Sequence, residues 1–186
     1  MTSFAFYMCS EKRTRFCFMK NLQEKMKFDN SKVRRQDRLL DEAEATELLK
    51  KGEYGIMSMT GKDSEPYGIP VNFAWDGAYS IYIHCAPEGR KLECLRNDPR
   101  ASFCIVGHTN VVSSKFTTGY ESIVLKCTAS THLEAEERMH ALKLILEKYS
   151  PEDMAIGLKY AEKSFARTEI IRLDITSWSG KCKRVK

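Results

Sequence analysis

The chain has 186 residues, of which 42% are hydrophobic and 30% charged, and its formal net charge is +5 at pH 7. These values are typical of one globular domain, and no stretch approaches the roughly 20 apolar residues that a membrane-spanning helix requires. The positive charge lies at the ends of the chain, with ten Lys and Arg against four Asp and Glu in residues 1–38 and four basic residues in 181–186. This distribution disfavours nucleic-acid binding, because nucleic-acid-binding surfaces gather basic residues on the folded body.

The N-terminal residues 1–33 mix Phe, Met and Cys with basic residues and show no sustained periodicity. We predict a weakly ordered extension here and expect ordered structure to begin near Leu39. Met26 is a candidate start of translation, with the preceding residues as an upstream extension. The main domain is expected over residues 34–180, followed by a basic C-terminal tail at 181–186. A nucleic-acid binder that acts through these basic ends stays an alternative.

A helix is predicted directly after Asp41. Asp41 and Glu44 fit a variant of the capping box, and apolar residues follow at helical spacing as far as Gly52, which is typical of a helix end. Further along the chain, apolar periodicity predicts helices over residues 134–149 and from 151 to about 163.

Six strand-like runs surround these helices. They cover residues 54–60, 67–75, 78–84, 100–106, 121–130 and 168–176. Asp76-Gly77 is a strong hairpin signal, and residues 107–110 have the composition of a turn. Hairpin-linked strands with few helices between them favour an antiparallel sheet, and closure into a barrel is the usual protection for short strand edges. We therefore predict a mainly β (α+β) fold, a six-stranded antiparallel barrel with flanking helices.

The seven cysteines are odd in number and contain no C-x-x-C pair, unlike zinc ribbons and thioredoxin-type sites. We expect reduced thiols in a cytoplasmic protein, with Cys104 and Cys127 as small buried residues. The mildly apolar first ten residues precede basic ones, which is the wrong order for a secretory signal. The four histidines lack metal-ligand spacing, so no metal site is predicted, and His132 and His140 are expected at the surface.

The stretch His84-Cys85-Ala86-Pro87-Glu88-Gly89-Arg90-Lys91 carries the clearest functional signal. Free backbone N–H groups at a helix start favour an anion, whereas cations usually lie at the other end of a helix. A bound phosphate would therefore explain Arg90 and Lys91 in a first helical turn, and His84 just upstream can exchange a proton near neutral pH. A solvated basic turn beside a partly buried histidine explains these residues equally well.

A second unusual stretch is Gly68-Ile69-Pro70-Val71-Asn72, in which a proline interrupts a strand. Proline is tolerated at a strand edge or bulge, and a break there frees backbone groups to face a flat heteroaromatic ring. A simple bulge at the barrel rim accounts for the same pattern. The chain contains no dinucleotide fingerprint, Walker A loop, zinc-protease motif or nucleophile elbow.

Several segments, taken together, have a specific order and spacing. They are Arg35-Gln36-Asp37-Arg38, Gly52-Glu53-Tyr54-Gly55, Pro66-Tyr67-Gly68-Ile69-Pro70-Val71-Asn72, the His84–Lys91 stretch, Asn97-Asp98-Pro99-Arg100-Ala101-Ser102-Phe103 and Lys115-Phe116-Thr117-Thr118-Gly119-Tyr120-Glu121-Ser122. In these segments the chain resembles the flavin-binding split-barrel proteins related to pyridoxamine 5′-phosphate oxidase, and most of all their nitroimidazole-resistance branch. The resemblance covers about four-fifths of the chain.

The resemblance implies a six-stranded Greek-key split barrel that forms a homodimer, with FMN held in clefts at the dimer interface. It implies that Arg90 and Lys91 approach the FMN phosphate and that His84 lies near the flavin ring. The other residues that it implies are Ser58, Met59, Thr60, Pro70, Val71 and Asn72 along the flavin, and Tyr120, Ser122 and Trp178 from the partner subunit. The long N-terminal extension has no counterpart in the family.

The implied function is that of an FMN-dependent oxidoreductase that reduces a nitroaromatic, 5-nitroimidazole-like or related electrophilic small molecule. The acceptor would stack on the reduced flavin, and protons must follow the electrons. His84 is then either the proton donor or a group that positions the flavin or its loop. A flavin- or haem-binding module without turnover, built on the same barrel, stays the alternative.

Overall fold

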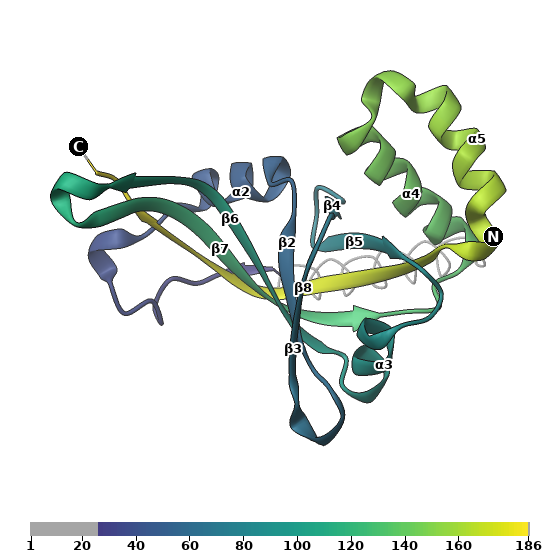
Figure 1. Cartoon of the computed structure of the whole chain (residues 1–186), viewed down its shortest axis with the longest axis horizontal. Coiled ribbons are helices and arrows are strands. Elements are labelled where there is room, and N and C mark those ends of the chain that lie inside the picture. Colours follow the sequence, from purple (N-terminus) through teal and green to yellow (C-terminus); the bar gives the residue numbers. More distant parts are fainter. Residues whose placement is uncertain (1–25, 186) are drawn as a thin grey trace, which may run out of the picture.

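The computed structural model describes residues 26–185, which form one eight-stranded sheet with helices around it (Figure 1). The strands follow the order β3-β2-β6-β7-β8-β5-β4, and β1 joins the sheet by parallel pairing with β8. The pairings along this path are antiparallel. The prediction of a mainly β fold with six antiparallel strands is confirmed, since β1 and β4 contain only two residues each.

The strands are β1 (Lys27–Phe28), β2 (Gly55–Thr60), β3 (Pro66–Val71), β4 (Ala74–Trp75), β5 (Ser80–Cys85), β6 (Arg100–Val112), β7 (Thr117–Ser130) and β8 (Glu169–Lys183). The α-helices are α2 (Glu42–Lys51), α3 (Arg90–Asn97), α4 (Ala135–Tyr149) and α5 (Met154–Ser164).

The barrel is split rather than closed. Strands β3 and β4 are consecutive in the chain but occupy opposite edges of the sheet, and Asn72–Phe73 carries the chain from one edge to the other. The backbone N–H of Phe73 donates to the Tyr149 hydroxyl at 3.0 Å rather than to a neighbouring strand. The donor is thus satisfied by a side chain rather than by a strand. The two edges stay apart here, and the closure expected from edge protection does not occur.

Helix α2 forms as the sequence predicts. The Asp41 side chain accepts a hydrogen bond from the Glu44 backbone N–H at 2.8 Å, which caps the first turn. The Gly52 N–H donates to Leu48 O at 2.9 Å and ends the helix. Ala45 and Leu49 on its inner face are fully buried, so α2 covers one end of the barrel core.

The main core lies inside the sheet. Its largest fully buried side chains include Phe73 and Phe103, whose rings meet edge to face with centroids 5.2 Å apart. Gly55 faces Phe103 so closely that a Cβ at this position would lie 2.2 Å from the ring. Met59 and Trp178 belong to the same cluster. The core therefore uses residues from the strands on both sides of the split.

Strands β6 and β7 extend beyond their apolar runs and form an arm that projects away from α4 and α5 (Figure 1). The prediction of a turn at Gly107–Asn110 is wrong, because these residues lie inside β6 at a register shift between Val106 and Thr109. A Cβ at Gly107 would lie 2.5 Å from Glu121 Oε1. The glycine therefore marks an irregularity in a strand, while the turn follows at Ser113–Lys115.

Both ends of the described chain are more structured than their composition predicts. Trp178 Nε1 donates to Met26 O at 3.1 Å, and the Phe28 and Trp178 rings lie 4.9 Å apart. Ordered structure thus begins well before Leu39, because aromatic packing on β8 holds this segment. At the other end, residues 181–183 belong to β8 rather than to a tail. The part of the predicted extension in residues 1–25 lies outside the described residues.

Helices α4 and α5 form a hairpin beside the β4–β5 end of the sheet (Figure 1). A second, smaller apolar cluster joins them to the barrel and includes Tyr82, Ala141, Ala161 and Ile170. None of the helices within residues 26–185 is long and apolar enough to cross a bilayer.

Candidate functional site

Four of the predicted site residues come together at the split of the barrel. Val71, Asn72, His84 and Lys91 line one cleft of about 470 Å³. They come from the end of β3, the end of β5 and the first turn of α3. Gly89 makes this meeting possible because its φ of +129° turns the chain from β5 into α3, a conformation that side-chain-bearing residues rarely adopt. Pro70, next to Val71, is exposed at the same edge.

The C-terminal end of α4 fastens the chain where β3 breaks. The Tyr149 hydroxyl accepts from Phe73 N–H and lies 2.6 Å from Glu53 O, while Asn72 Nδ2 donates to the same Glu53 oxygen at 2.9 Å. Lys148 Nζ donates to Phe73 O at 2.9 Å and lies 3.6 Å from the Phe73 ring centroid. These contacts hold Asn72 at the edge of the cleft.

His84 lies at the surface of the monomer but within this cleft. Burial against the surrounding protein, together with the positive charge of Lys91, holds the pKa of His84 below its usual value of 6.5. The imidazole is therefore mainly neutral at pH 7, with one nitrogen that donates and one that accepts. A neutral ring is better suited to positioning a ligand than to delivering a proton.

The two cations predicted to share a phosphate are separated in the structure. Arg90 forms an ion pair with Glu65 at 2.7 Å, and its guanidinium lies 4.4 Å from the Tyr67 ring centroid. Lys91 instead lines the cleft, where Arg167 provides a second cation. Lys91 and Arg167 are therefore the pair that can meet an anion beside His84.

Sequence reasoning did not identify Arg167, Lys148 or Tyr149. A basic residue close to the end of a helix is ordinary, because it complements the helix dipole, so Arg167 has no distinguishing signal. Lys148 and Tyr149 likewise read as the last turn of an amphipathic helix. Only the packing of α4 and of the α5–β8 connection on the split brings these side chains to the site.

The second predicted group, Ser58, Met59 and Thr60, lines a different recess. This recess has a volume of about 600 Å³ and also includes Arg100 and Lys126. Ser58 is exposed and Thr60 half-buried, whereas Met59 is only 5% exposed and contributes mainly to the barrel core. Within one chain, the predicted flavin residues are thus divided between the cleft at His84 and this second surface.

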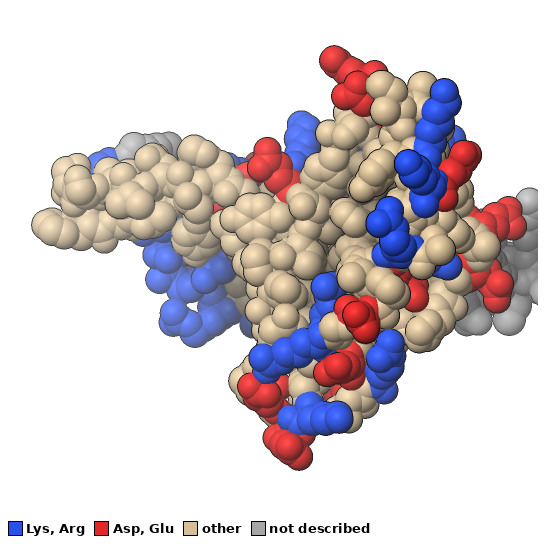
Figure 2. Space-filling view, turned by 45° about the vertical axis from the view of Figure 1, so that its right-hand side comes forward, with Lys and Arg blue, Asp and Glu red and all other residues tan. Residues whose placement is uncertain are grey.

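Tyr120 lies in a third recess of about 250 Å³ on the β6–β7 arm. Burial would raise its pKa, but hydrogen bonds with Lys181 and Arg38 outweigh burial and lower the pKa of its hydroxyl. Ser122 follows on β7 and is half-buried, with Lys181 opposite it in register. Figure 2 shows the arm, at left, as a largely uncharged surface on the face in view, with basic side chains gathered beneath it.

Trp178 is not brought to any of these recesses. Its indole is 3% exposed, packs on Phe28, and donates its N–H to Met26 O. The side chain is therefore occupied by the chain's own N-terminal segment, a contact that the sequence does not indicate.

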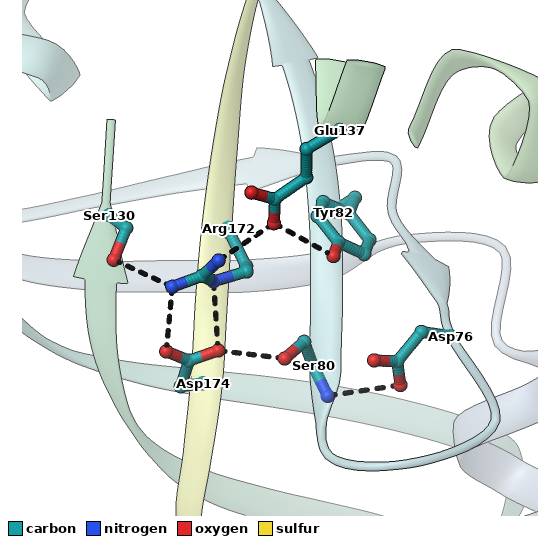
Figure 3. A network of polar contacts seen from close by, with 7 residues as sticks. All are labelled: Asp76, Ser80, Tyr82, Ser130, Glu137, Arg172 and Asp174. Atoms are coloured by element: carbon teal, nitrogen blue, oxygen red, sulfur yellow. Dashed lines mark hydrogen bonds and ion pairs between the residues drawn. The ribbon is translucent and has the colours of Figure 1, made fainter. Parts of the chain in front are cut away.

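A polar network ties α4 to the sheet beneath the helical hairpin (Figure 3). Arg172 on β8 forms ion pairs with Glu137 at 2.7 Å and with Asp174 at 3.0 Å. Glu137 also accepts from the Tyr82 hydroxyl at 3.1 Å, and Ser80 Oγ donates to Asp174 at 2.7 Å. Burial, and after it the negative charge of Glu137, suppress ionisation of Tyr82 by raising its pKa. The network fixes the N-terminal end of α4 to strand β8.

Other titratable residues are spread over the surface. His132 and His140 are exposed as predicted, Cys127 is buried, and Cys104 is half-buried because it lies on the outer face of β6. The described cysteines are free thiols. Among residues 26–185, no three His, Cys, Asp or Glu side chains gather into a group that could hold a metal ion.

Most of the split barrel matches a known protein family. Residues 41–182 match the family model described as pyridoxamine 5′-phosphate oxidase. The chain belongs to the pyridoxamine 5′-phosphate oxidase family. Proteins of this family bind flavin, and the matched residues span the barrel, the His84 cleft and the α4–α5 hairpin. The resemblance inferred from the sequence is confirmed.

Solved structures show the same fold at low sequence identity. A candidate 5-nitroimidazole antibiotic resistance protein from Bacteroides thetaiotaomicron superposes with a TM-score of 0.67 at 19% identity, covering 78% of this chain and 86% of that one. An FAD and haem binding protein from Mycobacterium smegmatis gives 0.62 at 20% identity, covering 81% and 75%. The haem storage protein HutZ from Vibrio cholerae gives 0.55 at 13% identity, covering 72% and 89%. A search of curated proteins finds no match.

Proposed function

We propose that the protein is an FMN-dependent oxidoreductase that reduces nitroaromatic or related electrophilic small molecules, and that it acts as a homodimer with FMN at the interface. The observation that carries the proposal is the cleft where Lys91 and Arg167 accompany a neutral His84 and the fixed amide of Asn72. Its volume of about 470 Å³ lies in the range of small-molecule and cofactor sites.

The residues in this cleft fit a phosphorylated, heteroaromatic ligand. Lys91 and Arg167 can pair with a phosphate dianion, with the first turn of α3 adjoining Lys91. Asn72 and His84 offer donors and acceptors to a ring edge. This donor set is typical of a site that holds a flavin mononucleotide by its phosphate at one end and its ring at the other.

The arm supports a dimeric site. Val111 is 76% exposed and Phe116 is 97% exposed, and Val106 and Val124 on the same two strands are also exposed. Exposed apolar residues concentrated on one projection mark an interaction surface. The proposed occupant is a second copy of the chain, in which Tyr120 with its neighbouring cations Arg38 and Lys181 completes the site of the partner.

When bound, FMN supplies a two-electron carrier that an external reductant recharges. Reduction of a nitro group to a nitroso group consumes two electrons and two protons and releases water. In this chain Lys91 and Arg167 would hold the phosphate, Asn72 would meet the ring edge, and His84 would orient the acceptor by its N–H. With its pKa below 6.5, His84 acts mainly as a positioning residue at neutral pH, and solvent supplies the protons.

An absorption spectrum of the purified full chain is the first test. Bands near those of free flavin, released by heat as FMN rather than FAD, are expected. A Soret band in their place would contradict the flavin assignment and indicate a haem-binding module. Flavin-loaded protein that transfers electrons to no nitroaromatic, with dithionite or a nicotinamide as reductant, would leave the cofactor assignment intact and overturn the enzymatic one.

The separation of the two basic neighbours provides a matched pair of variants. Lys91→Met should weaken FMN binding about tenfold or more, the effect of losing one ionic partner of a phosphate. Arg90→Met should leave FMN binding within about twofold, because Arg90 is engaged by Glu65 and Tyr67. Equal losses in the two variants, measured by flavin fluorescence titration, would contradict the assignment of Lys91 to the phosphate.

His84 is tested separately from flavin retention. His84→Ala should keep the yellow colour yet lose most nitroreductase turnover, and His84→Gln, which retains an N–H donor, should restore part of it. An unchanged rate in His84→Ala would remove this residue from the chemistry. Loss in both variants, with a rate that falls as pH rises through the histidine pKa in the wild type, would show that His84 donates a proton instead.

A further inference from the structure

A second cavity lies between the α4–α5 hairpin and the end of β5. Its volume is about 360 Å³, and it is partly open to solvent beside Tyr160. Its wall is mainly apolar and includes Leu142, Ile145 and Leu146 from α4 and Ala161 from α5. A volume and lining of this kind are typical of sites for small, mainly apolar ligands.

This cavity adjoins the cationic cleft. Asn72, His84 and Thr168 line both spaces. The cleft contains Lys91 and Arg167, whereas no Lys, Arg, Asp or Glu is among the described residues that line the cavity. The two spaces are therefore chemically different compartments that meet at His84, one suited to an anion and the other to an uncharged group, because an unpaired charge is costly to bury.

The cavity is held open by fixed contacts of the hairpin. A Cβ at Gly157 would lie 2.6 Å from Leu146 Cδ2, so α5 already approaches α4 as closely as a glycine permits. At the other end, Arg138 donates to Phe165 O at 2.9 Å, and its guanidinium lies 4.2 Å from the Phe165 ring centroid. The helices are thus anchored on both sides of the cavity and cannot collapse into it without losing these contacts.

We propose that this cavity binds the electron-accepting substrate, and that the substrate is a neutral, mainly apolar small molecule whose polar group lies at His84 and Asn72. Naming the ligand as the acceptor rests on the function proposed above, whereas the neutral, apolar character of the ligand follows from the cavity itself. The charged part of the flavin and the uncharged acceptor would then occupy separate compartments with the imidazole between them.

Two probes of similar size separate the neutral from the anionic class. We expect 4-nitrotoluene to bind the full chain saturably, and 4-nitrobenzoate to bind at least about tenfold more weakly, because its carboxylate has no cation in the cavity. Binding is followed by calorimetry and by methyl shifts of Leu142 and Ile145 in NMR spectra. Equal binding of the two probes, or no binding of 4-nitrotoluene, would overturn the proposal.

Variants assign the binding to the cavity. Ser164→Phe, which fills it from α5, should weaken 4-nitrotoluene binding about tenfold, while Lys163→Phe on the neighbouring exposed position should leave it unchanged. A second pair avoids any risk to folding. Tyr160 lines the cavity and is 69% exposed, and Ile156 is 72% exposed on the same helix but does not line it. Tyr160→Ala should weaken binding severalfold and Ile156→Ala should not. Equal effects within each pair would place the probe elsewhere and overturn the proposal.

Flavin content, read from the absorbance of the same samples, keeps the two proposals apart. Probe binding in the cavity of protein that retains no flavin would support the ligand class and overturn the oxidoreductase function. Flavin-loaded protein whose Leu142 and Ile145 methyl signals do not respond to 4-nitrotoluene would overturn the cavity proposal and leave the flavin function standing.

Discussion

The barrel and the α4–α5 hairpin are stabilised by different interactions. The barrel core is large and apolar, with fully buried side chains from β2, β5, β6, β7 and β8. The hairpin rests on a small apolar cluster and is held at its base by the Glu137–Arg172–Asp174 network. The C-terminal turn of α4 is fastened to the split by Lys148 and Tyr149.

This difference explains where the candidate sites lie. A tightly packed barrel leaves no room for a ligand, so both spaces that meet at His84 form where the hairpin and α3 are attached to the split. Polar contacts can hold a helix pair at a distance from the sheet, whereas apolar packing would draw the surfaces together. The hairpin is therefore positioned by hydrogen bonds and ion pairs at both ends of α4, in addition to its small apolar cluster.

The largest effect is expected in the barrel. Phe103→Ala removes a fully buried ring that packs on Phe73, and should lower the free energy of unfolding by about 3–5 kcal/mol. Denaturant titration followed by far-UV circular dichroism measures the loss. Because the hairpin depends on the barrel, the barrel and the helices should unfold in one transition, and separate transitions would contradict this dependence.

A smaller and more local effect is expected at the base of the hairpin. Glu137→Gln leaves Arg172 with only part of its ionic partners and should cost about 1–2 kcal/mol, since the pair is partly exposed. Hydrogen exchange should quicken in α4 and α5 before it quickens in β6 and β7. Glu136→Gln, an exposed neighbour, is the control, and an equal change in this variant would show that the network is not the cause.

Lys148 should make the attachment of the hairpin sensitive to alkaline pH. Burial lowers the pKa of Lys148 to about 8 from the usual 10.5, so between these values the unfolded chain binds a proton that the folded chain does not. The stability contributed at this residue therefore rises as pH increases from about 8 to 10.5, by about 1 kcal/mol after allowance for solvent. Lys148→Met should lose this rise.

The comparison for this prediction is Lys143→Met on the same helix. Lys143 is exposed, so the Lys143→Met protein should still gain stability between about pH 8 and 10.5, as the wild type does. Urea midpoints at several pH values between 7.5 and 10.5 provide the measurement. A rise of equal size in the Lys148→Met and Lys143→Met proteins would rule out Lys148 as its source.

The smallest effect is expected at the cleft itself. Lys91→Met removes one of the two causes that lower the pKa of His84, so that pKa should rise, but stay below 6.5 because burial persists. A change of less than about one pH unit is expected in an NMR titration of the histidine ring protons. A fall in the His84 pKa would contradict the placement of Lys91.

Local patterns predicted much of the fold but only part of the site. The Asp41 cap and the hairpin at Asp76-Gly77 follow from side-chain and backbone chemistry within a few residues. The predicted break at Pro70 is wrong, because Pro70 pairs with Ile56 inside the edge strand β3, and the strand expected over residues 67–75 ends only after Val71. The meeting of Asn72, His84 and Lys91 follows from the family resemblance rather than from local patterns, since Asn72 lies inside the strand predicted over residues 67–75. Arg167 and Tyr149 could not be predicted, because nothing near them in the chain distinguishes them from ordinary helix-end residues.

The sequence by itself determined the six strands, the helices between them, the family, and the basic turn before α3, because periodicity, caps and turn residues act over short distances. Tertiary structure alone decided that Lys91 rather than Arg90 faces the cleft, that Trp178 is covered by the segment around Phe28, and that an uncharged cavity adjoins His84. Those outcomes depend on which surfaces meet across the split, and the contacts involved join residues far apart in the chain.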